Sequence, residues 1–92
     1  MLWLLCYDVA DNKRRRKLVQ LLEQRCLRVQ YSVFECPLDE KTLRRLLQER
    51  WLPVLNLKQD SLRIYPLDKN AVRRTLVYGS PPPYEPPDYV IL

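Results

Sequence analysis

The chain has 92 residues, which suits one small domain, and small domains often complete their cores by pairing with a second chain. Its 16 lysines and arginines against 11 aspartates and glutamates give a net charge of +5, which favours a polyanionic partner. Three cysteines without a CxxC pair, together with the absence of histidine, leave too few ligands for a zinc site and predict a reduced, cytoplasmic protein.

The first predicted element is a buried strand over residues 2–9, a compact apolar run that reaches the carboxylate Asp8. Alternation divides the strand into two faces, Leu2, Leu4, Cys6 and Asp8 against Trp3, Leu5 and Tyr7. The run is too short to span a membrane and lacks the basic start and cleavage site of a signal peptide. We therefore expect neither a membrane segment nor export.

A helix is predicted over about residues 12–27, because apolar residues recur at helical spacing and Asp11 or Asn12 can cap its first turn. The apolar positions are Leu18, Val19, Leu22 and Cys26. Its outer face is basic, since seven lysines and arginines lie between Lys13 and Arg28 with one acid, Glu23.

A basic run of this kind is usually an ordinary solvated helix face. Here, however, like charges crowd the positive end of a helix dipole close to Asp8, and a phosphate backbone would relieve their repulsion. We therefore predict salt-sensitive, largely sequence-independent binding of nucleic acid. The candidate contacts are Arg14, Arg15, Arg16, Lys17 and Arg28.

The middle of the chain predicts one strand and one helix. Residues 28–36, RVQYSVFEC, are rich in β-branched and aromatic residues and indicate a single strand. A second helix is expected over residues 39–52, with Asp39 as its cap and Pro53 as its limit.

Beyond the second helix, residues 61–67 alternate as a strand, residues 69–74 suit one helical turn, and residues 75–78 suit a short last strand. The resulting order, β-α-β-α-β-β, is close to the ferredoxin-like order βαββαβ. We predict an α+β fold: a ferredoxin-like β-α-β sandwich with an antiparallel sheet and helices on one face.

The domain is expected to span residues 1–79 and to end at the only glycine, Gly79. Residues 80–92 hold five of the eight prolines and predict an extended tail. A short strand over residues 89–92 could add to a sheet edge of the other protomer or of a partner.

The helix-free face of the sheet is predicted to carry apolar residues, drawn from sets such as Trp3, Leu5 and Tyr7 or Gln30, Ser32 and Phe34. An apolar face of this kind usually marks a partner surface. A symmetric homodimer through that face is the economical solution, and it would let Asp8 meet its own copy.

Four motifs together carry a resemblance to a known family. They are YDV at residues 7–9, KRRRKL at 13–18, RVQYSVFEC at 28–36 and LRIYPL at 62–67. With these motifs the chain resembles the small CRISPR-associated endonucleases of the adaptation machinery, which partner the CRISPR integrase. One departure is Cys26, which stands where the family usually has a glycine closing the first helix.

The resemblance implies a ferredoxin-like homodimer with a Mg²⁺-dependent phosphodiesterase centred on Asp8, with Mn²⁺ as a possible substitute. Family members cut single-stranded RNA in some cases and double-stranded DNA in others, and in the adaptation complex the protein resembles a non-catalytic bridge between integrase dimers. On spacing alone, Asp8 could equally cap a turn or pair with an arginine. The resemblance favours a catalytic and metal-binding Asp8, with the metal generating the nucleophile because the chain has no histidine.

The other candidate residues have structural alternatives. Asp11 is better explained as a helix cap than as a metal ligand. Tyr7 and Phe34 could stack on bases, although packing at the dimer interface is favoured, and Ser32 is assigned to hydrogen bonding near the site. The three cysteines are expected to pack as small apolar residues.

Three functions follow, in order of preference. The first is a cytoplasmic, homodimeric, metal-dependent endonuclease acting in CRISPR spacer acquisition as partner of the integrase. The second is a non-catalytic DNA-binding scaffold that bridges integrase dimers. The third is a toxin-like ribonuclease or RNA-binding domain of the same shape.

Overall fold

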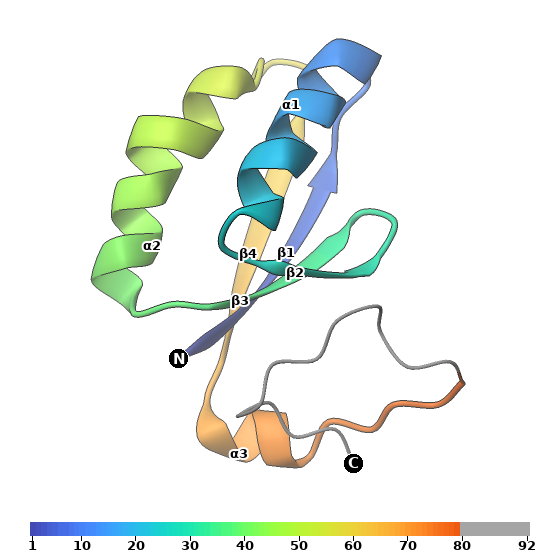
Figure 1. The fold of residues 1–92 in the computed structure, drawn as a ribbon, viewed down its shortest axis with the longest axis vertical. Coiled ribbons are helices and arrows are strands. Elements are labelled where there is room, and N and C mark those ends of the chain that lie inside the picture. Colours follow the sequence, from blue (N-terminus) through green and yellow to red (C-terminus); the bar gives the residue numbers. More distant parts are fainter. Residues whose placement is uncertain (80–92) are drawn as a thin grey trace.

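The computed structural model describes residues 1–79, which form one four-stranded antiparallel sheet with α1 and α2 on one face (Figure 1). The elements are β1 (Leu2–Asp8), α1 (Asn12–Glu23), β2 (Leu27–Gln30), β3 (Val33–Pro37), α2 (Glu40–Leu46), β4 (Ser61–Leu67) and α3 (Lys69–Arg73). The strands lie in the order β2-β3-β1-β4, each antiparallel to its neighbours. The predicted α+β, ferredoxin-like fold is confirmed. The predicted tail over residues 80–92 lies outside the described residues.

The prediction of a single strand over residues 28–36 is wrong. The segment is a hairpin in which the two-residue turn Tyr31-Ser32 joins β2 to β3, with Gln30 opposite Val33. Neither turn residue is a glycine, proline, asparagine or aspartate, the residues that usually mark such a turn in a sequence. The additional strand moves α2 one place later and restores the strict order βαββαβ.

The second helix begins as predicted and continues further in altered form. Asp39 caps α2 by accepting the Thr42 N–H at 3.2 Å. A π-helical turn (Leu47–Trp51) and a short 3₁₀ turn (Leu52–Val54) then carry the chain past Pro53. The predicted helical turn near residues 69–74 is α3, whereas residues 75–78 form no strand in the described part of the chain.

The core lies between the sheet and the helices. Leu5 is opposite Phe34 on β3 and Ile64 on β4, so these residues share one face of the sheet. Trp3, Leu5 and Tyr7 are each at most 7 % exposed. The helical side of the core contributes Leu18, Leu21, Leu22, Leu43 and Trp51.

The prediction that Trp3, Leu5, Tyr7 or Phe34 could line the helix-free face is therefore wrong. That face carries the alternate residues of β1, including Leu4, Cys6 and Asp8. Both faces of β1 carry mostly apolar side chains, so alternation alone could not tell which face the helices cover.

The two ends of α1 are closed in different ways. At the start, the Asp11 carboxylate accepts the Arg14 N–H at 2.8 Å, which confirms the predicted cap. The helix ends at Glu23, earlier than predicted, and the Cys26 N–H still reaches the Leu22 carbonyl at 2.7 Å. In the described residues no side-chain-bearing residue has a positive φ, so α1 ends without the left-handed residue that a glycine would supply.

Cys26 and Cys36 form a disulfide, with their Cα atoms 4.4 Å apart. Both residues are buried, whereas Cys6 on the helix-free face is free. The prediction of three reduced cysteines is thus wrong for this pair. The two residues are 10 apart in sequence, and only the unpredicted hairpin folds the chain back far enough to join them.

We expect reduction of this disulfide to lower the free energy of unfolding by about 2–3 kcal/mol, the value for a loop of this length. Urea unfolding followed by circular dichroism, with and without a phosphine reductant, measures the difference. In the Cys26→Ala/Cys36→Ala double variant, the reductant should not change the free energy of unfolding. The Cys6→Ser variant should behave as wild type. Equal stability of the wild type in both buffers would contradict the prediction.

In the described residues, no helix is both long and apolar enough to cross a membrane.

Candidate functional site

A groove of about 310 Å³ opens between the first turns of α1 and the β2-β3 turn. Its lining combines three arginines, two tyrosines and two further residues of α1: Arg15, Arg16, Arg28, Tyr7, Tyr31, Val19 and Gln20. The basic run of α1 and the RVQYSVFEC segment, which are separate in the sequence, thus meet at one place.

The backbone carbonyl of Tyr31 organises the wall of this groove. It accepts the Tyr7 hydroxyl at 3.0 Å and two N–H groups of Arg28, Nε at 3.1 Å and Nη2 at 2.6 Å. Burial raises the pKa of Tyr7, with Arg28 opposing the shift, so its hydroxyl remains a neutral donor. The Arg28 guanidinium also lies 5.2 Å from the Tyr31 ring centre and 5.8 Å from that of Phe34. Arg28 is therefore held in place at the rim.

Asp8 is the exposed last residue of β1, and its backbone pairs with Ser61 of β4. Its neighbours on both sides are tied to the groove residues: Tyr7 through its hydroxyl, and Val9 through its carbonyl, which accepts Arg15 Nη1 at 2.9 Å. Asp8 thus extends from a fixed piece of backbone, directly after Tyr7, which lines the groove.

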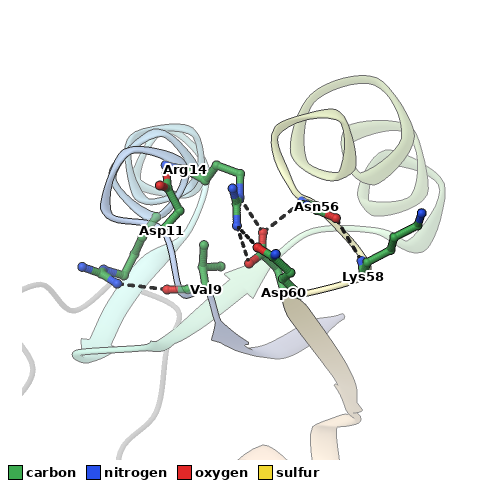
Figure 2. Close-up of polar contacts among 8 residues, drawn as sticks. Val9, Asp11, Arg14, Asn56, Lys58 and Asp60 are labelled. Carbon is green, nitrogen blue, oxygen red and sulfur yellow. Dashed lines mark hydrogen bonds and ion pairs between the residues drawn. The ribbon is translucent and has the colours of Figure 1, made fainter.

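Not all predicted nucleic-acid contacts lie in this groove. Arg15, Arg16 and Arg28 line it, whereas Lys17 is exposed on α1 outside the lining. Arg14 points the other way, into an ion pair with Asp60 at 2.8 Å (Figure 2). Its guanidinium is already occupied by a carboxylate.

The supporting residues also have defined places. Phe34 is fully buried and lies 6.2 Å from Tyr7, ring centre to ring centre, so neither ring is open to a base or to the helix-free face. Ser32 contributes its backbone carbonyl, which accepts the Tyr7 N–H at 3.2 Å.

Two residues that organise this region were missed from sequence. Tyr31 acts through a backbone carbonyl, for which no side-chain pattern exists. Asp60 directly precedes a strand, as Asp8 ends one, and its sequence position gave no sign that it is buried.

For a metal ion, Asp8 is the available donor at this edge. In residues 1–79 no group of three or more histidines, cysteines, aspartates or glutamates is gathered to hold a metal. Mg²⁺ does not need such a cage, because it is often held by one or two carboxylates with water and substrate phosphate completing its shell. A single exposed carboxylate at this edge, Asp8, fits that mode and does not fit an all-protein cage.

Comparison with known proteins identifies the family. The model of the family described as CRISPR associated protein Cas2 matches residues 1–75, which include β1, α1, the hairpin and β4. The chain belongs to the Cas2 family. The resemblance found in the four sequence motifs is thereby confirmed.

Individual Cas2 proteins are similar over most of their length. The protein named "CRISPR-associated endoribonuclease Cas2 2" of Synechocystis sp. is 66% identical over 90 residues, which cover 98% of this chain and 97% of that protein. The crystal structure of Streptococcus pyogenes Cas2 at pH 6.5 has a TM-score of 0.73 and 34% identity, covering 86% of this chain and 100% of that one. A chain of a structure titled "Partial Cas6-RT-Cas1--Cas2 complex" has a TM-score of 0.68 and 32% identity, and the match covers 80% of this chain and 86% of that one.

Proposed function

We propose that this Cas2 protein is a metal-dependent endoribonuclease with Asp8 as its catalytic and metal-binding carboxylate. The observation that carries the proposal is the exposed Asp8 at the end of β1, between two residues bonded to the walls of an arginine-lined groove. The relative of 66% identity is named an endoribonuclease, which favours RNA over DNA as substrate.

In this proposal the groove holds the phosphates that flank the scissile bond. Arg15, Arg16 and Arg28 present guanidinium groups, which pair with phosphate oxygens through two parallel hydrogen bonds. Tyr31, with 70% of its surface exposed, is the aromatic residue available for base stacking, in place of the buried Tyr7 and Phe34.

The proposed cofactor is Mg²⁺, with Mn²⁺ as a substitute, held by Asp8. When bound, the ion would neutralise charge on the phosphate and make a bound water more acidic. Asp8 itself orients the attacking water, while the arginines stabilise the charge that develops on the non-bridging oxygens. The chain has no histidine to share this work.

We further propose that two copies pair through the helix-free face of the sheet. That face exposes apolar surface at Leu4, Cys6 and Val33, and Tyr65 is 42% exposed beside them. Because Asp8 alternates onto the same face, a two-fold partner would bring a second Asp8 toward the first. Two carboxylates then become available to one ion.

The wild type should cleave single-stranded RNA in Mg²⁺ or Mn²⁺ and fail to do so in a chelator. The assay compares single-stranded RNA with duplex DNA, and an identically purified Asp8→Ala variant excludes a contaminating nuclease. Cleavage by both proteins, or by neither on any substrate, would contradict the proposal.

The groove arginines should govern the salt dependence of binding. We expect Arg15→Ala, Arg16→Ala and Arg28→Ala each to reduce the slope of log K against log salt by about 1, equally for all sequences. Fluorescence anisotropy with labelled RNA in chelator measures binding without cleavage. Arg45→Ala on α2 removes the same charge elsewhere and serves as the control. An equal change in that control would contradict the role of the groove.

A second function, in CRISPR spacer acquisition, is supported by the similarity to a chain of the "Partial Cas6-RT-Cas1--Cas2 complex". In that role the cytoplasmic dimer would bind duplex DNA as a scaffold between integrase dimers, with residues 80–92 docking the integrase. Removing residues 80–92 should abolish co-purification with the integrase while the dimer stays folded. A truncated chain that still assembles would contradict the docking role.

A further inference from the structure

Asp60, the residue before β4, carries a carboxylate buried completely from solvent. Both of its oxygens are used (Figure 2): Arg14 Nε donates to one at 2.8 Å and Arg14 Nη2 to the other at 3.1 Å. The Asn56 N–H adds a third bond at 2.9 Å. A buried charge is costly even when paired, so its presence in a small domain needs an explanation.

The contacts of Asp60 join three segments that are distant in sequence. Arg14 belongs to the first turn of α1 and Asn56 to the turn that leads into β4. The Ala10 backbone N–H, from the β1-α1 connection, contributes to the lowered pKa of the Asp60 carboxyl. The turn from Asn56 to Asp60 is closed by a hydrogen bond in which the Asp60 N–H donates to the Asn56 carbonyl at 2.7 Å. Asp60 thus clamps the connection that follows β1 to the start of β4.

The clamped connection is the one that carries Asp8. Ala10 lies two residues beyond Asp8, and Ser61, the residue after Asp60, is the β4 partner of Asp8. Within the described residues the Asp8 carboxylate has no hydrogen bond or ion pair of its own, so it is held in place only through the backbone that carries it. On the other side of the connection, Arg15 Nη1 donates to the Val9 carbonyl at 2.9 Å.

We propose that Asp60 is a positioning residue that, through Arg14 and the Asn56 turn, fixes the backbone that carries Asp8. The inference rests on the proposed nuclease function for its kinetic consequence, and its structural consequence can be measured without it. It also assigns Arg14 to this clamp and not to a phosphate.

The test compares Asp60→Asn with Leu43→Ala, a cavity variant in the core beneath α2. Wild type and both variants are assayed at one temperature well below the lowest of their melting temperatures, so that each protein stays folded. Asp60→Asn should lower kcat for RNA cleavage about 10–100-fold, with KM within about twofold, because misplacement of a reacting group acts on the chemical step. Leu43→Ala should keep the wild-type kcat.

Amide hydrogen exchange provides the measurement that does not need activity. Asp60→Asn should speed exchange at residues 9–11 about 10-fold or more, whereas Leu43→Ala should leave these amides unchanged. If Asp60→Asn does not fold, Arg14→Lys replaces it, because lysine keeps the charge and loses the two-bond fork. The same pattern is then expected at a smaller size.

The outcomes are distinguishable. If the wild type cuts no substrate, the nuclease proposal fails, and the exchange data alone decide the positioning role. Unchanged exchange at residues 9–11, or a kcat no lower than that of Leu43→Ala, would overturn the positioning role even in an active nuclease.

Discussion

Asp8→Asn is expected to lower the single-turnover rate of Mg²⁺-dependent RNA cleavage by at least about 100-fold. Asparagine keeps the size of the side chain and loses the negative charge to which the proposal assigns metal binding. Because Asp8 is exposed, the melting temperature of the Asp8→Asn variant should equal that of the wild type. Asp11→Asn is the matched control, since asparagine is as good a helix cap as aspartate. Equal losses in both variants would point to disruption of the loop and not to chemistry at Asp8.

Mixed dimers extend this prediction to the proposed pairing of two Asp8 residues. When equal amounts of wild type and Asp8→Asn are unfolded and refolded together, about a quarter of the dimers carry two intact carboxylates. Activity should then fall to about a quarter of that of the same total amount of wild-type protein if both carboxylates are required, and to about half if each copy acts alone. Residual activity near one half would contradict a shared site.

The largest expected effect on stability comes from Asp60→Asn, which should lower the melting temperature by more than about 10 °C. The substitution leaves Arg14, only 27% exposed in its side chain, beside an uncharged partner. Thermal unfolding followed by circular dichroism measures the change. Glu40→Gln, which breaks the exposed pair with Arg44, should change the melting temperature by less than about 3 °C. Similar losses in both variants would contradict the distinction between the buried and the exposed pair.

The Arg14–Asp60 pair should also make the stability of the protein depend on pH in the acidic range. Hydrogen bonding from Arg14, more than any other contact, lowers the pKa of Asp60 from 3.8 to about 2. Because the folded pKa lies below the unfolded one, the stabilisation is complete above about pH 4 and is lost as the pH falls toward 2. The difference in melting temperature between wild type and Asp60→Asn should therefore be constant near neutrality and shrink between about pH 4 and 2. A difference that persists unchanged at pH 2 would contradict the ion pair.

The sequence predicted the elements that have a recognisable side-chain pattern. β1, both long helices, the caps Asp11 and Asp39, and β4 follow from apolar spacing and from residues that accept backbone N–H groups. The hairpin could not be predicted because its turn, Tyr31-Ser32, has none of the glycine, asparagine or aspartate residues that mark two-residue turns and lies within a β-branched and aromatic run. Once it was missed, neither the strict element order nor the Cys26–Cys36 disulfide could be predicted.

The sequence predicted most of the residues of the candidate site, but not how they are arranged. Arg15, Arg16 and Arg28 do gather around one groove, but Arg14, in the same basic run, turns to Asp60. Consecutive helical residues point about 100° apart, so a run of arginines cannot share one surface. Which of them meets a buried carboxylate depends on a turn more than forty residues away in sequence.

The Tyr31 carbonyl has a consequence for how this groove should be studied. Three hydrogen bonds converge on an oxygen that every residue type possesses, while the Tyr31 side chain is mostly exposed. Alanine scanning at this position removes the ring and leaves the acceptor in place, so it would understate the importance of the residue. An amide-to-ester substitution between residues 31 and 32, which weakens the carbonyl as an acceptor without altering any side chain, is the change to which Arg28 and Tyr7 would respond.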